Sequence, residues 1–443
     1  MNLKDKKVLV VGLGKSGMAA YELLKKMGAL VSLYDGNKEM KIESVDVPLY
    51  LGDLPEEMFS GFDCAVFSPG VPLDIPVARY LIHNRVPVIG EIELAWLMER
   101  GQVMGITGTN GKTTTTTLTG EIMRAYNQKT FVVGNIGNPY TKEVLKSEKD
   151  SVTVAEISSF QLETIDTFSP KVSAVLNITP DHLNRHGTME NYIDAKISIT
   201  KNQGADQLCV LNYEDEVLRE RARHMRCRTL FFSSRRKLSQ GMYKDENGNL
   251  VMAEDGRVIL NQKETRLPGD HNAENIMAAL MMVFEMGVPE ELAAEVVRNF
   301  KPVEHRVEFV KSVNGVDYYN DSKGTNPDAA IKGIQSMDRP TVLIGGGYDK
   351  GGDFSEWIRS FDGKVKRLLL LGATRERIAK NAKDCGFTDY QFVDTLEEAV
   401  STASELAAAG DAVLLSPACA SWDMFASYEQ RGNMFKELVN GLE

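Results

Sequence analysis

A glycine-rich loop between an apolar strand and a helix occurs twice in this chain, and it constrains the fold more than any other feature. At the first occurrence, residues 6–12 (KKVLVVG) have the composition of a buried strand, and residues 17–27 carry apolar side chains at helical spacing. A second apolar run follows at residues 31–35. A strand, a helix and a strand in this order form a right-handed unit with parallel strands. The sequence therefore predicts an α/β protein.

The same alternation continues along the chain and predicts three domains. A chain of 443 residues exceeds what one hydrophobic core usually organises. We expect a Rossmann-like domain over residues 1–93, a central P-loop domain with a parallel sheet over 94–300, and a second Rossmann-like domain over 301–443. Further strands are expected at residues 64–68, 86–89, 103–107, 131–134, 152–157, 174–178, 316–320, 341–346, 367–372, 391–394 and 411–416, and further helices at 273–286, 376–385 and 396–409.

Composition and charge exclude several classes of protein. The 51 basic and 62 acidic residues give a net charge of −11, which disfavours nucleic acid and anionic membranes as partners. No run of about 18 apolar residues is present, and the start of the chain leads directly into the first strand, so we expect a cytoplasmic protein. Five scattered cysteines without a CxxC pair argue against a disulfide framework and a zinc site. The arginine-rich stretch 219–228, with 235–237, favours a solvated helix face.

The first glycine loop, GLGKSG at residues 12–17, has the spacing of a dinucleotide-binding fingerprint. Asp35 stands at the end of the second strand, where such a fingerprint carries an acidic residue. Glycines let the backbone approach a pyrophosphate at a helix N-terminus, where free amides favour an anion. Because this physics does not depend on the attached nucleoside, the loop fits NAD(P), FAD, another nucleotide or a structural turn.

The second glycine loop, GTNGKTT, follows the strand at 103–107 and suits the phosphates of ATP. Lys112 would contact the β and γ phosphates, and Thr113 would hold Mg²⁺. Ile106 occupies the position of the first glycine in the strict GxxxxGK[ST] pattern. Glu156, after an apolar run, stands where a P-loop protein carries an acidic metal ligand. The alternative is a threonine-rich turn with an incidental lysine.

A polar segment, TPDHLNRHG at residues 179–187, follows the strand predicted at 174–178. Ligands of α/β sheets bind at the carboxyl ends of strands. Two histidines and an aspartate within six residues, namely Asp181, His182 and His186, therefore favour a metal or phosphate site over structural histidines.

These motifs resemble the Mur ligases, which form amide bonds in peptidoglycan precursors at the expense of ATP. The segments GTNGKTT, NITPDHLNRHGT, YIDAKISI, GDHNAENIMAAL, EHRVE and NDSKGTNPDA occur in the family's order over nearly the whole chain. Within the family, GLGKSG, SPG, GNIG and LSPACASWDMFASYEQRG resemble the members that add D-glutamate to UDP-N-acetylmuramoyl-L-alanine. The resemblance implies an acyl-phosphate intermediate, ATP and two Mg²⁺ ions, small-molecule partners only, and a monomeric chain.

The resemblance also implies a role for individual residues. The ATP site would comprise Gly108, Thr109, Asn110, Gly111, Lys112, Thr113, Thr114, Asn272, Asn275, Arg306 and Asp321. The first glycine loop would hold UDP and no nicotinamide, through Gly14, Lys15, Ser16 and Asp35, with Asn135 nearby. Metal ions would be bound by Thr113 and Glu156, and by His182 with a carbamylated Lys196. Lys112, His182, Lys196 and Lys323 would be catalytic, and D-glutamate would be bound by Thr325, Lys350, Ser421 and Tyr428.

Three rival interpretations remain at this point. The loop GLGKSG with Asp35 also fits an NAD-dependent oxidoreductase, although this leaves the second glycine loop unexplained. Folylpolyglutamate synthase, or a Mur ligase for another amino acid, would share the P-loop, but folate ligases begin near that loop and lack the first 100 residues. The third rival is a nucleotide-binding scaffold without catalysis.

Overall fold

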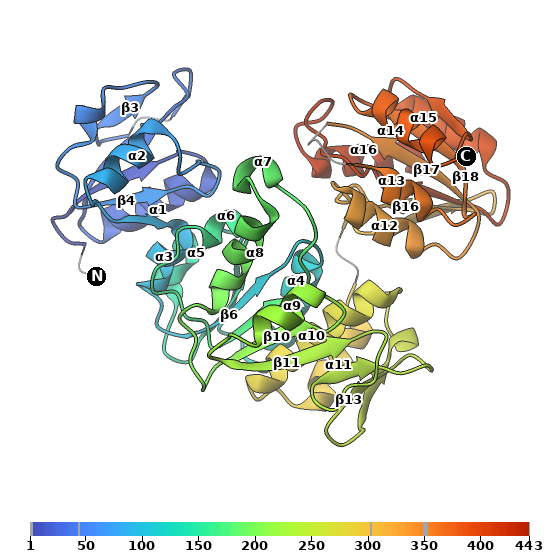
Figure 1. Cartoon of the computed structure of the whole chain (residues 1–443), viewed down its shortest axis with the longest axis horizontal. Coiled ribbons are helices and arrows are strands. Elements are labelled where there is room, and N and C mark those ends of the chain that lie inside the picture. The colour runs from blue at the N-terminus through green and yellow to red at the C-terminus, as the bar shows by residue number, and fades with distance from the viewer. Residues whose placement is uncertain (1–2, 43–44, 302–303, 349–352, 443) are drawn as a thin grey trace. The chain divides into compact units, whose positions relative to one another are not determined.

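The structure, a computed structural model, describes residues 3–42, 45–301, 304–348 and 353–442. It confirms an α/β fold with three sheets, each dominated by parallel strands (Figure 1). The chain divides into two compact units: Met1–Glu264 with Ala273–Asn299, and Thr265–Asn272 with Phe300–Glu443. The first unit holds two sheets and the second unit holds one. The expected domain boundaries near residues 93 and 300 stay predictions.

The N-terminal sheet has five parallel strands in the order β3-β2-β1-β4-β5. They are β1 (Lys7–Val11), β2 (Leu30–Asp35), β3 (Leu49–Leu51), β4 (Cys64–Phe67) and β5 (Val88–Gly90), joined in part by α1 (Lys15–Lys26) and α2 (Pro76–His83). The central strand β1 is apolar and buried from Val8 onward, because helices cover both faces of a parallel sheet. Strand order reverses between β1 and β4, so the glycine loop after β1 lies at the point where such sheets bind ligands. Only β3 was not predicted.

The central sheet has nine strands in the order β14-β13-β12-β11-β10-β9-β6-β8-β7. They are β6 (Gln102–Thr107), β7 (Thr130–Gly134), β8 (Val152–Glu156), β9 (Val172–Val175), β10 (Leu208–Asn212), β11 (Arg228–Ser233), β12 (Met242–Lys244), β13 (Asn249–Met252) and β14 (Val258–Asn261). Its helices are α3 (Glu91–Trp96), α4 (Lys112–Tyr126), α5 (Tyr140–Glu143), α6 (Ser159–Leu162), α7 (Leu183–His186), α8 (Met189–Ile197), α9 (Glu216–Ala222), α10 (Asp270–Glu285) and α11 (Glu290–Asn299).

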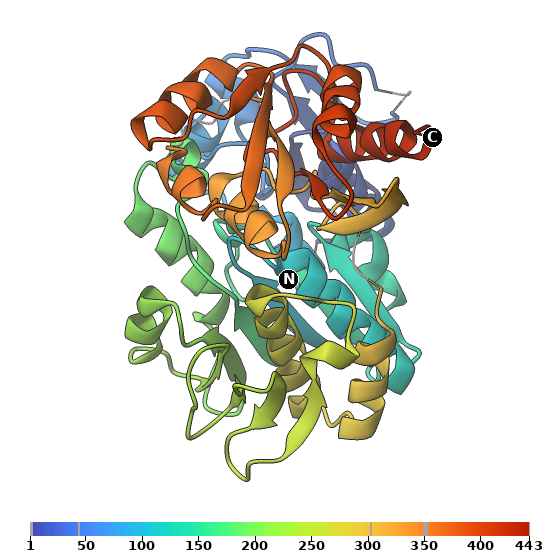
Figure 2. The same ribbon diagram turned by 90° about the vertical axis from the view of Figure 1, so that its right-hand side faces the viewer.

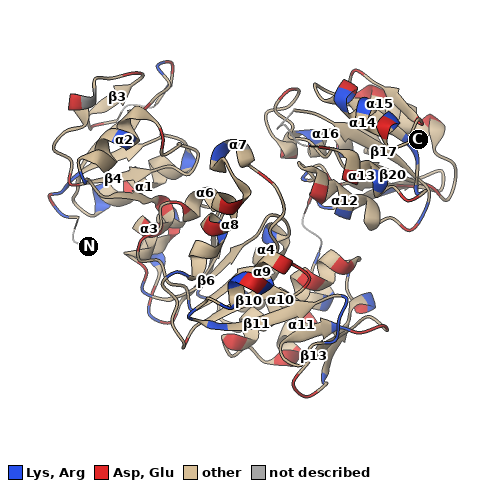
Figure 3. Cartoon of the chain, viewed as in Figure 1, with Lys and Arg blue, Asp and Glu red and all other residues tan. Residues whose placement is uncertain are grey.

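Three predictions for this sheet need correction. The strand predicted at 174–178 ends at Val175, because Asn177 turns its side chain to the backbone of the second glycine loop. Strands β10 to β14 were not predicted, and the last two of them pair antiparallel at one edge of the sheet (Figures 1 and 2). The arginine-rich stretch is helical only up to Ala222, since Arg228 already begins β11. Basic and acidic residues are interspersed along α9 and its neighbours (Figure 3).

The second unit contains a six-stranded sheet in the order β15-β16-β20-β17-β18-β19, in which only β15 is antiparallel among the described strands. The strands are β15 (Glu308–Val313), β16 (Val316–Asn320), β17 (Thr341–Gly346), β18 (Val365–Leu371), β19 (Tyr390–Phe392) and β20 (Ala412–Leu415). The helices are α12 (Pro327–Gln335), α13 (Ser355–Arg359), α14 (Arg375–Asp384), α15 (Leu396–Leu406) and α16 (Tyr428–Asn440). Helix α15 ends three residues before the predicted Ala409, because Ala407 is extended and Ala408 donates to the Asp411 carboxylate.

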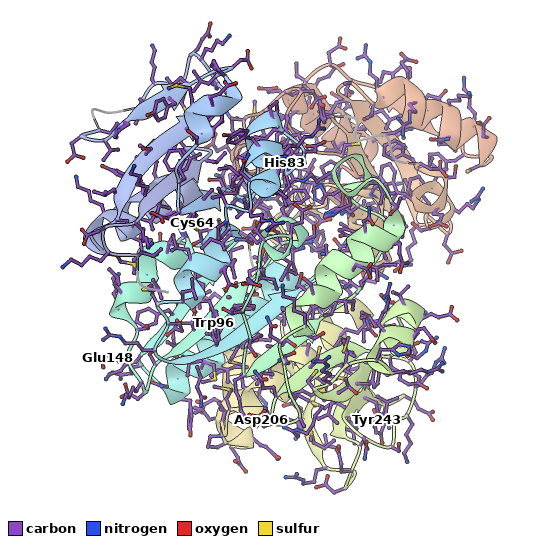
Figure 4. The ribbon with its side chains drawn as sticks, turned by 60° about the vertical axis from the view of Figure 1, so that its left-hand side comes forward. Cys64, His83, Trp96, Glu148, Asp206 and Tyr243 are labelled. Carbon is purple, nitrogen blue, oxygen red and sulfur yellow. The ribbon has the colours of Figure 1, made fainter. Side chains whose placement is uncertain are left out.

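The two sheets of the first unit share one continuous hydrophobic core. Helix α3 lies at their junction, where Trp96 packs edge-on against Phe168 with ring centroids 5.5 Å apart (Trp96 is labelled in Figure 4). The Glu93 carboxylate accepts the backbone N–H groups of Asp166, Thr167 and Phe168. These contacts join the first sheet to the second without a flexible linker. No helix among the described residues is long and apolar enough to span a bilayer, and all five cysteines are free.

We predict that Glu91→Gln stabilises the protein above pH 5. Glu91 is buried, with Oε1 accepting from Thr141 and Oε2 without a hydrogen-bond partner among the described residues, and burial raises its pKa. A carboxyl group with a higher pKa in the folded state than in the unfolded state does not oppose folding while it is protonated in both states. The protein loses stability as pH rises from the pKa of the unfolded state to that of the folded state. Each pKa unit is worth about 1.4 kcal/mol.

The measured quantity is the difference in the free energy of urea unfolding between the variant and the parent protein, from pH 5 to pH 8. The difference should grow with pH. Glu93→Gln is the matched control and should destabilise the protein, because its amide NH₂ would face backbone N–H donors. A constant Glu91→Gln difference across this range would contradict the prediction.

Candidate functional site

A polar site lies at the carboxyl ends of three neighbouring strands of the central sheet. Ile106 of β6 is in register with Glu156 of β8 on one side and with Ala174 of β9 on the other. The loop after β6, the end of β8 and the segment after β9 therefore meet at one edge of the sheet. Helix α4 begins at Lys112, directly after this loop, so its free amides are available to an anion there.

The second glycine loop has the backbone geometry of an anion cradle. Gly111 has a φ of +82°, and a Cβ at this position would lie 2.3 Å from Asn275 Oδ1. Only glycine therefore fits between the loop and α10. Asn275 Oδ1 also accepts from the Thr115 hydroxyl at 3.2 Å. The structure thus brings Asn275 against the loop, as the sequence-based assignment to the ATP site requires.

Two residues after β9 hold the glycine loop in place. Asn177 accepts the Asn110 N–H at 2.8 Å through Oδ1 and donates to the Asn110 carbonyl at 3.1 Å. The Thr109 hydroxyl donates to the Thr179 carbonyl at 3.1 Å. Sequence reasoning missed Asn177, although it lies inside the segment NITPDHL. Its amide is suited to this role because it satisfies the backbone donor and the backbone acceptor of the same residue.

Two lysines converge on one carbonyl of this loop. Lys112 Nζ lies 2.8 Å from Gly108 O and 2.8 Å from Thr109 O, and Lys196 Nζ lies 2.7 Å from Gly108 O. Lys196 is only 2% exposed. Burial, and then the charge of Lys112, lower the pKa of Lys196 well below its usual range. The Lys196 amine is therefore biased towards its neutral, nucleophilic form.

Glu156 has the features of a metal ligand. It is 1% exposed; its Oε1 accepts from Asn135 Nδ2 at 2.7 Å, and its Oε2 has no hydrogen-bond partner among the described residues. A buried carboxylate oxygen without a donor is unfavourable unless a cation binds it. Thr113, whose hydroxyl is expected on the same ion, lies in the first turn of α4.

A magnesium ion fits this donor set better than a transition metal. No group of three or more His, Cys, Asp or Glu residues that could hold a metal occurs in the described part of the chain. Mg²⁺ prefers hard oxygen ligands and is usually held by one or two protein groups, with waters and phosphates completing its shell. Glu156 and Thr113 match that description.

The two histidines of the segment after β9 have different environments. His186 is buried between the Ser159 hydroxyl at 3.0 Å and Glu163 at 3.3 Å, and burial lowers its pKa. The His182 side chain is 34% exposed, its backbone has a left-handed φ of +53°, and its backbone N–H donates to Asp181 Oδ1 at 2.9 Å. Strained backbone of this kind is concentrated at functional sites. His186 therefore has a structural role, and His182 stays the candidate ligand.

The first glycine loop is shaped by Asp35. Asp35 accepts the Leu13 N–H at 2.8 Å and the Asn37 N–H at 2.9 Å, so its carboxylate orders the loop and the end of β2. Gly14 and Lys15 are exposed and Ser16 is half-buried at the N-terminus of α1. Lys15 Nζ donates to Gly137 O at 2.6 Å, in the GNIG segment that also contains Asn135. Asn135 thus belongs to a loop that contacts the glycine loop, but its own side chain bonds Glu156.

Most of the site residues that were predicted for the second unit lie where β16 and β20 end. Asp321 is buried and accepts from the Ser416 hydroxyl at 2.7 Å. Burial raises the Asp321 pKa, and the nearby Arg306 guanidinium opposes this rise; Arg306 Nε has no hydrogen-bond partner among the described residues. Lys323 Nζ lies 5.2 Å from the centre of the Tyr428 ring. The Thr325 N–H donates to the Lys323 carbonyl.

Arg431 is a residue of this region that sequence reasoning missed. It is buried on α16, and its guanidinium donates to the Ser322 hydroxyl at 3.0 Å, the Ser322 carbonyl at 2.8 Å and the Cys419 carbonyl at 3.2 Å. Ser322 precedes Lys323, and Cys419 lies two residues before Ser421. Arg431 therefore joins the two loops that carry the predicted acceptor residues. Its position in the segment EQRG was the available signal.

Two predicted residues need separate mention. Asn272 donates to the Pro268 carbonyl at 2.7 Å and belongs to the second unit, whereas Asn275 belongs to the first. Lys350 lies outside the described residues.

We predict that Asp321→Asn makes the second unit more stable above pH 6 and less active. Burial raises the Asp321 pKa from 3.8 to about 6. The free energy of unfolding therefore falls as Asp321 ionises, up to a pH of about 6. The difference between the two pKa values corresponds to a loss of about 3 kcal/mol at pH 8. Asparagine keeps the acceptor for Ser416 and carries no charge.

Calorimetric unfolding at pH 5 and pH 8 measures this effect, and the gain should be largest at pH 8. Asp317→Asn, on the same β16 strand, is the control; it breaks an ion pair with Arg339 and should give no gain. A loss of stability at both pH values for Asp321→Asn would show that its charge supports the fold.

Comparison with known protein families gives three matches along the chain. A Mur ligase MurD-like N-terminal domain matches residues 6–90, a Mur ligase middle domain matches 106–283, and a Mur ligase glutamate ligase domain matches 305–419.

Full-length relatives are similar over the whole chain. Proteins from Lachnoclostridium phytofermentans and Clostridioides difficile, both named UDP-N-acetylmuramoylalanine--D-glutamate ligase, are 52% and 47% identical and cover 100% of both chains. Among solved structures, UDP-N-acetylmuramate-alanine ligase MurC from Thermotoga maritima has a TM-score of 0.61 at 18% identity, covering 98% of this chain and 99% of its own. MurF ligase from Thermotoga maritima in complex with ADP has a TM-score of 0.57 at 16% identity, with 99% and 96% coverage. At these identities the solved structures support the fold.

Proposed function

Because this chain belongs to the Mur ligase family, we propose that it joins D-glutamate to UDP-N-acetylmuramoyl-L-alanine through an amide bond, with ATP as the energy source. The product would be a cytoplasmic peptidoglycan precursor. The observation that carries the proposal is the convergence of Lys112 and Lys196 on Gly108 O, beside the partnerless Glu156 oxygen. A lysine cation at the start of a helix, a buried lysine amine and a buried acid together suit a site for phosphoryl transfer.

The chemistry requires activation of a carboxylate. A carboxylate is a poor electrophile, and an ammonium group is not a nucleophile, so the two do not condense in water. The carboxylate oxygen of the L-alanine residue would attack the γ-phosphorus of ATP, with ADP leaving, to form an acyl phosphate. The deprotonated amine of D-glutamate would then attack the acyl carbon, and inorganic phosphate would leave with the C–O bonding pair.

The residues of the first unit would neutralise charge during the first step. Lys112 would leave its two loop carbonyls for the β and γ phosphates, since a phosphate is a stronger acceptor than a neutral carbonyl. Glu156 and Thr113 would hold Mg²⁺, which supplies positive charge to the transferring phosphoryl group when bound.

Carbamylation of Lys196 would create a second anionic ligand beside His182. The reaction joins the neutral amine to carbon dioxide with loss of one proton, and burial of Lys196 favours that neutral amine. A carbamate would also place a negative charge where the neutral amine offers none to a metal ion. Lys196 and His182 are the residues of this chain proposed for the second magnesium ion.

In the second unit, Thr325, Lys350, Ser421 and Tyr428 are proposed to bind D-glutamate, and Arg306, Asp321 and Lys323 to act on ATP. The support is the gathering of the described members of this set at the ends of β16 and β20, where α/β sheets bind ligands. Lys15, Gly14, Ser16 and Asp35 are proposed to hold the UDP group.

Full-length relatives named for D-glutamate addition favour this function over the NAD-dependent and folate-ligase alternatives.

The test is phosphate release with ATP, Mg²⁺ and UDP-N-acetylmuramoyl-L-alanine against a panel of D- and L-amino acids. We expect turnover with D-glutamate and none without the UDP-linked substrate. Turnover with L-alanine and the unextended UDP-N-acetylmuramic acid, and none with D-glutamate, would reject the proposed specificity. NADH binding without affinity for the UDP-sugar would reject the reaction class.

A further inference from the structure

We propose that Asn135 is a positioning residue that fixes the Glu156 carboxylate for the metal ion accompanying ATP. The inference deepens the proposed function, on which it rests, and it gives Asn135 a role different from the UDP contact expected of the GNIG segment.

Two hydrogen bonds tie Asn135 to Glu156. The Asn135 N–H donates to the Glu156 carbonyl at 2.8 Å, and Asn135 Nδ2 donates to Glu156 Oε1 at 2.7 Å. The same pair of strands brings them together, because Gly134 at the end of β7 is in register with Glu156 at the end of β8. Asn135 therefore donates hydrogen bonds to both the main chain and the carboxylate of Glu156.

The backbone leaves this pair little freedom. Gly134 has a φ of +102°, and a Cβ at Gly134 would lie 2.3 Å from the Glu156 carbonyl oxygen. The loop thus approaches the end of β8 more closely than any residue with a side chain allows. On the other side of the segment, Gly137 O accepts from Lys15. The position of the Asn135 amide follows from these contacts.

The two carboxylate oxygens of Glu156 therefore differ in their hydrogen bonding. Oε1 is engaged by Asn135, and Oε2 is buried without a hydrogen-bond partner among the described residues. The terminal torsion of a glutamate is broad, so an unrestrained carboxylate rotates. A donor on Oε1 selects one orientation and leaves Oε2 for a cation. Partners of this kind typically change metal affinity by about 10- to 100-fold when removed.

The experiment measures Mn²⁺ affinity by electron paramagnetic resonance, on the full chain with a non-hydrolysable ATP analogue and no UDP-linked substrate. Asn135→Ala should weaken Mn²⁺ binding about 10- to 100-fold. Asn138→Ala is the matched control, because Asn138 is an exposed asparagine directly after the GNIG segment, and its side chain donates to Glu143 at 2.8 Å. It should leave Mn²⁺ affinity unchanged. Glu156→Gln should abolish the same binding.

Steady-state kinetics separates the two roles of Asn135. For a positioning residue, Asn135→Ala should raise the Mg²⁺ concentration needed for half-maximal turnover, with KM for the UDP-linked substrate unchanged. A raised KM for that substrate with unaltered Mn²⁺ affinity would overturn the inference and make Asn135 a substrate ligand. Asn135→Ser, whose hydroxyl is too short to reach Oε1, provides a second variant should alanine perturb folding.

Failure of the proposed function has a different signature. A parent protein that binds Mn²⁺ and nucleotide, loses that binding in Asn135→Ala, and yet releases no phosphate with D-glutamate would retain the positioning role and reject the ligase assignment. Equal Mn²⁺ affinity in the parent, Asn135→Ala and Asn135→Ser would reject the positioning role whatever the reaction.

Discussion

Lys112→Met should lower substrate-dependent phosphate release by about 1,000-fold or more, because it removes the cation placed to meet the β and γ phosphates. Methionine has a similar length and no charge, so the variant should fold. In the structure the Lys112 ammonium bonds two carbonyls of its own loop, which keeps the side chain folded over the phosphate cradle. Loss of those two bonds should have little effect on stability beside the loss of turnover.

Single-turnover phosphate release measures the effect on chemistry, and calorimetric titration with ADP measures binding. Lys142→Met, a basic residue of α5 outside the loop, is the control and should keep parental turnover. A Lys112→Met protein with more than a tenth of parental turnover would reject the placement of the γ-phosphate at this loop.

Lys196→Met should be nearly inactive and at least as stable as the parent. Lys196 is buried, and burial with the charge of Lys112 lowers its pKa, so the fold disfavours a charged amine there. An apolar side chain of similar length removes the desolvation cost of that charge. The catalytic loss follows from the missing anionic ligand that a carbamate would supply, for which losses of about 1,000-fold are expected.

Two measurements test the carbamate. Turnover of the parent, prepared free of carbon dioxide, should rise on addition of bicarbonate, and small carboxylates should restore part of the activity of Lys196→Ala, whose cavity admits them. Lys201→Met, on the turn after α8, is the control, because the Lys201 ammonium donates to the Ile165 carbonyl. Full activity of Lys196→Met without any added anion would reject a ligand role for this lysine.

The sequence predicted most of the fold because buried parallel strands are recognisable from short apolar runs in the sequence. Strands such as β1, β6 and β17 are mostly apolar and buried after their first residue, and glycines mark the turns that follow the first two. Strands β12 to β14 were missed because they are short and lie at an edge of the sheet, where composition is less distinctive; β10 and β11 were missed although β10 is fully buried. The end of β9 was misplaced because Asn177 belongs to the loop it holds and not to the strand.

The reaction class can be predicted from local motifs, because phosphate chemistry depends on a glycine loop, its lysine and an acid at the end of a strand. Tertiary structure decided how those groups act on one another. The neutral bias of Lys196 comes from burial and from Lys112, 84 positions earlier in the chain. Only one carboxylate oxygen of Glu156 is hydrogen-bonded among the described residues, because Asn135, in the loop after the neighbouring strand, donates to Oε1. Burial and contacts between distant residues are properties of packing, and no local pattern encodes them.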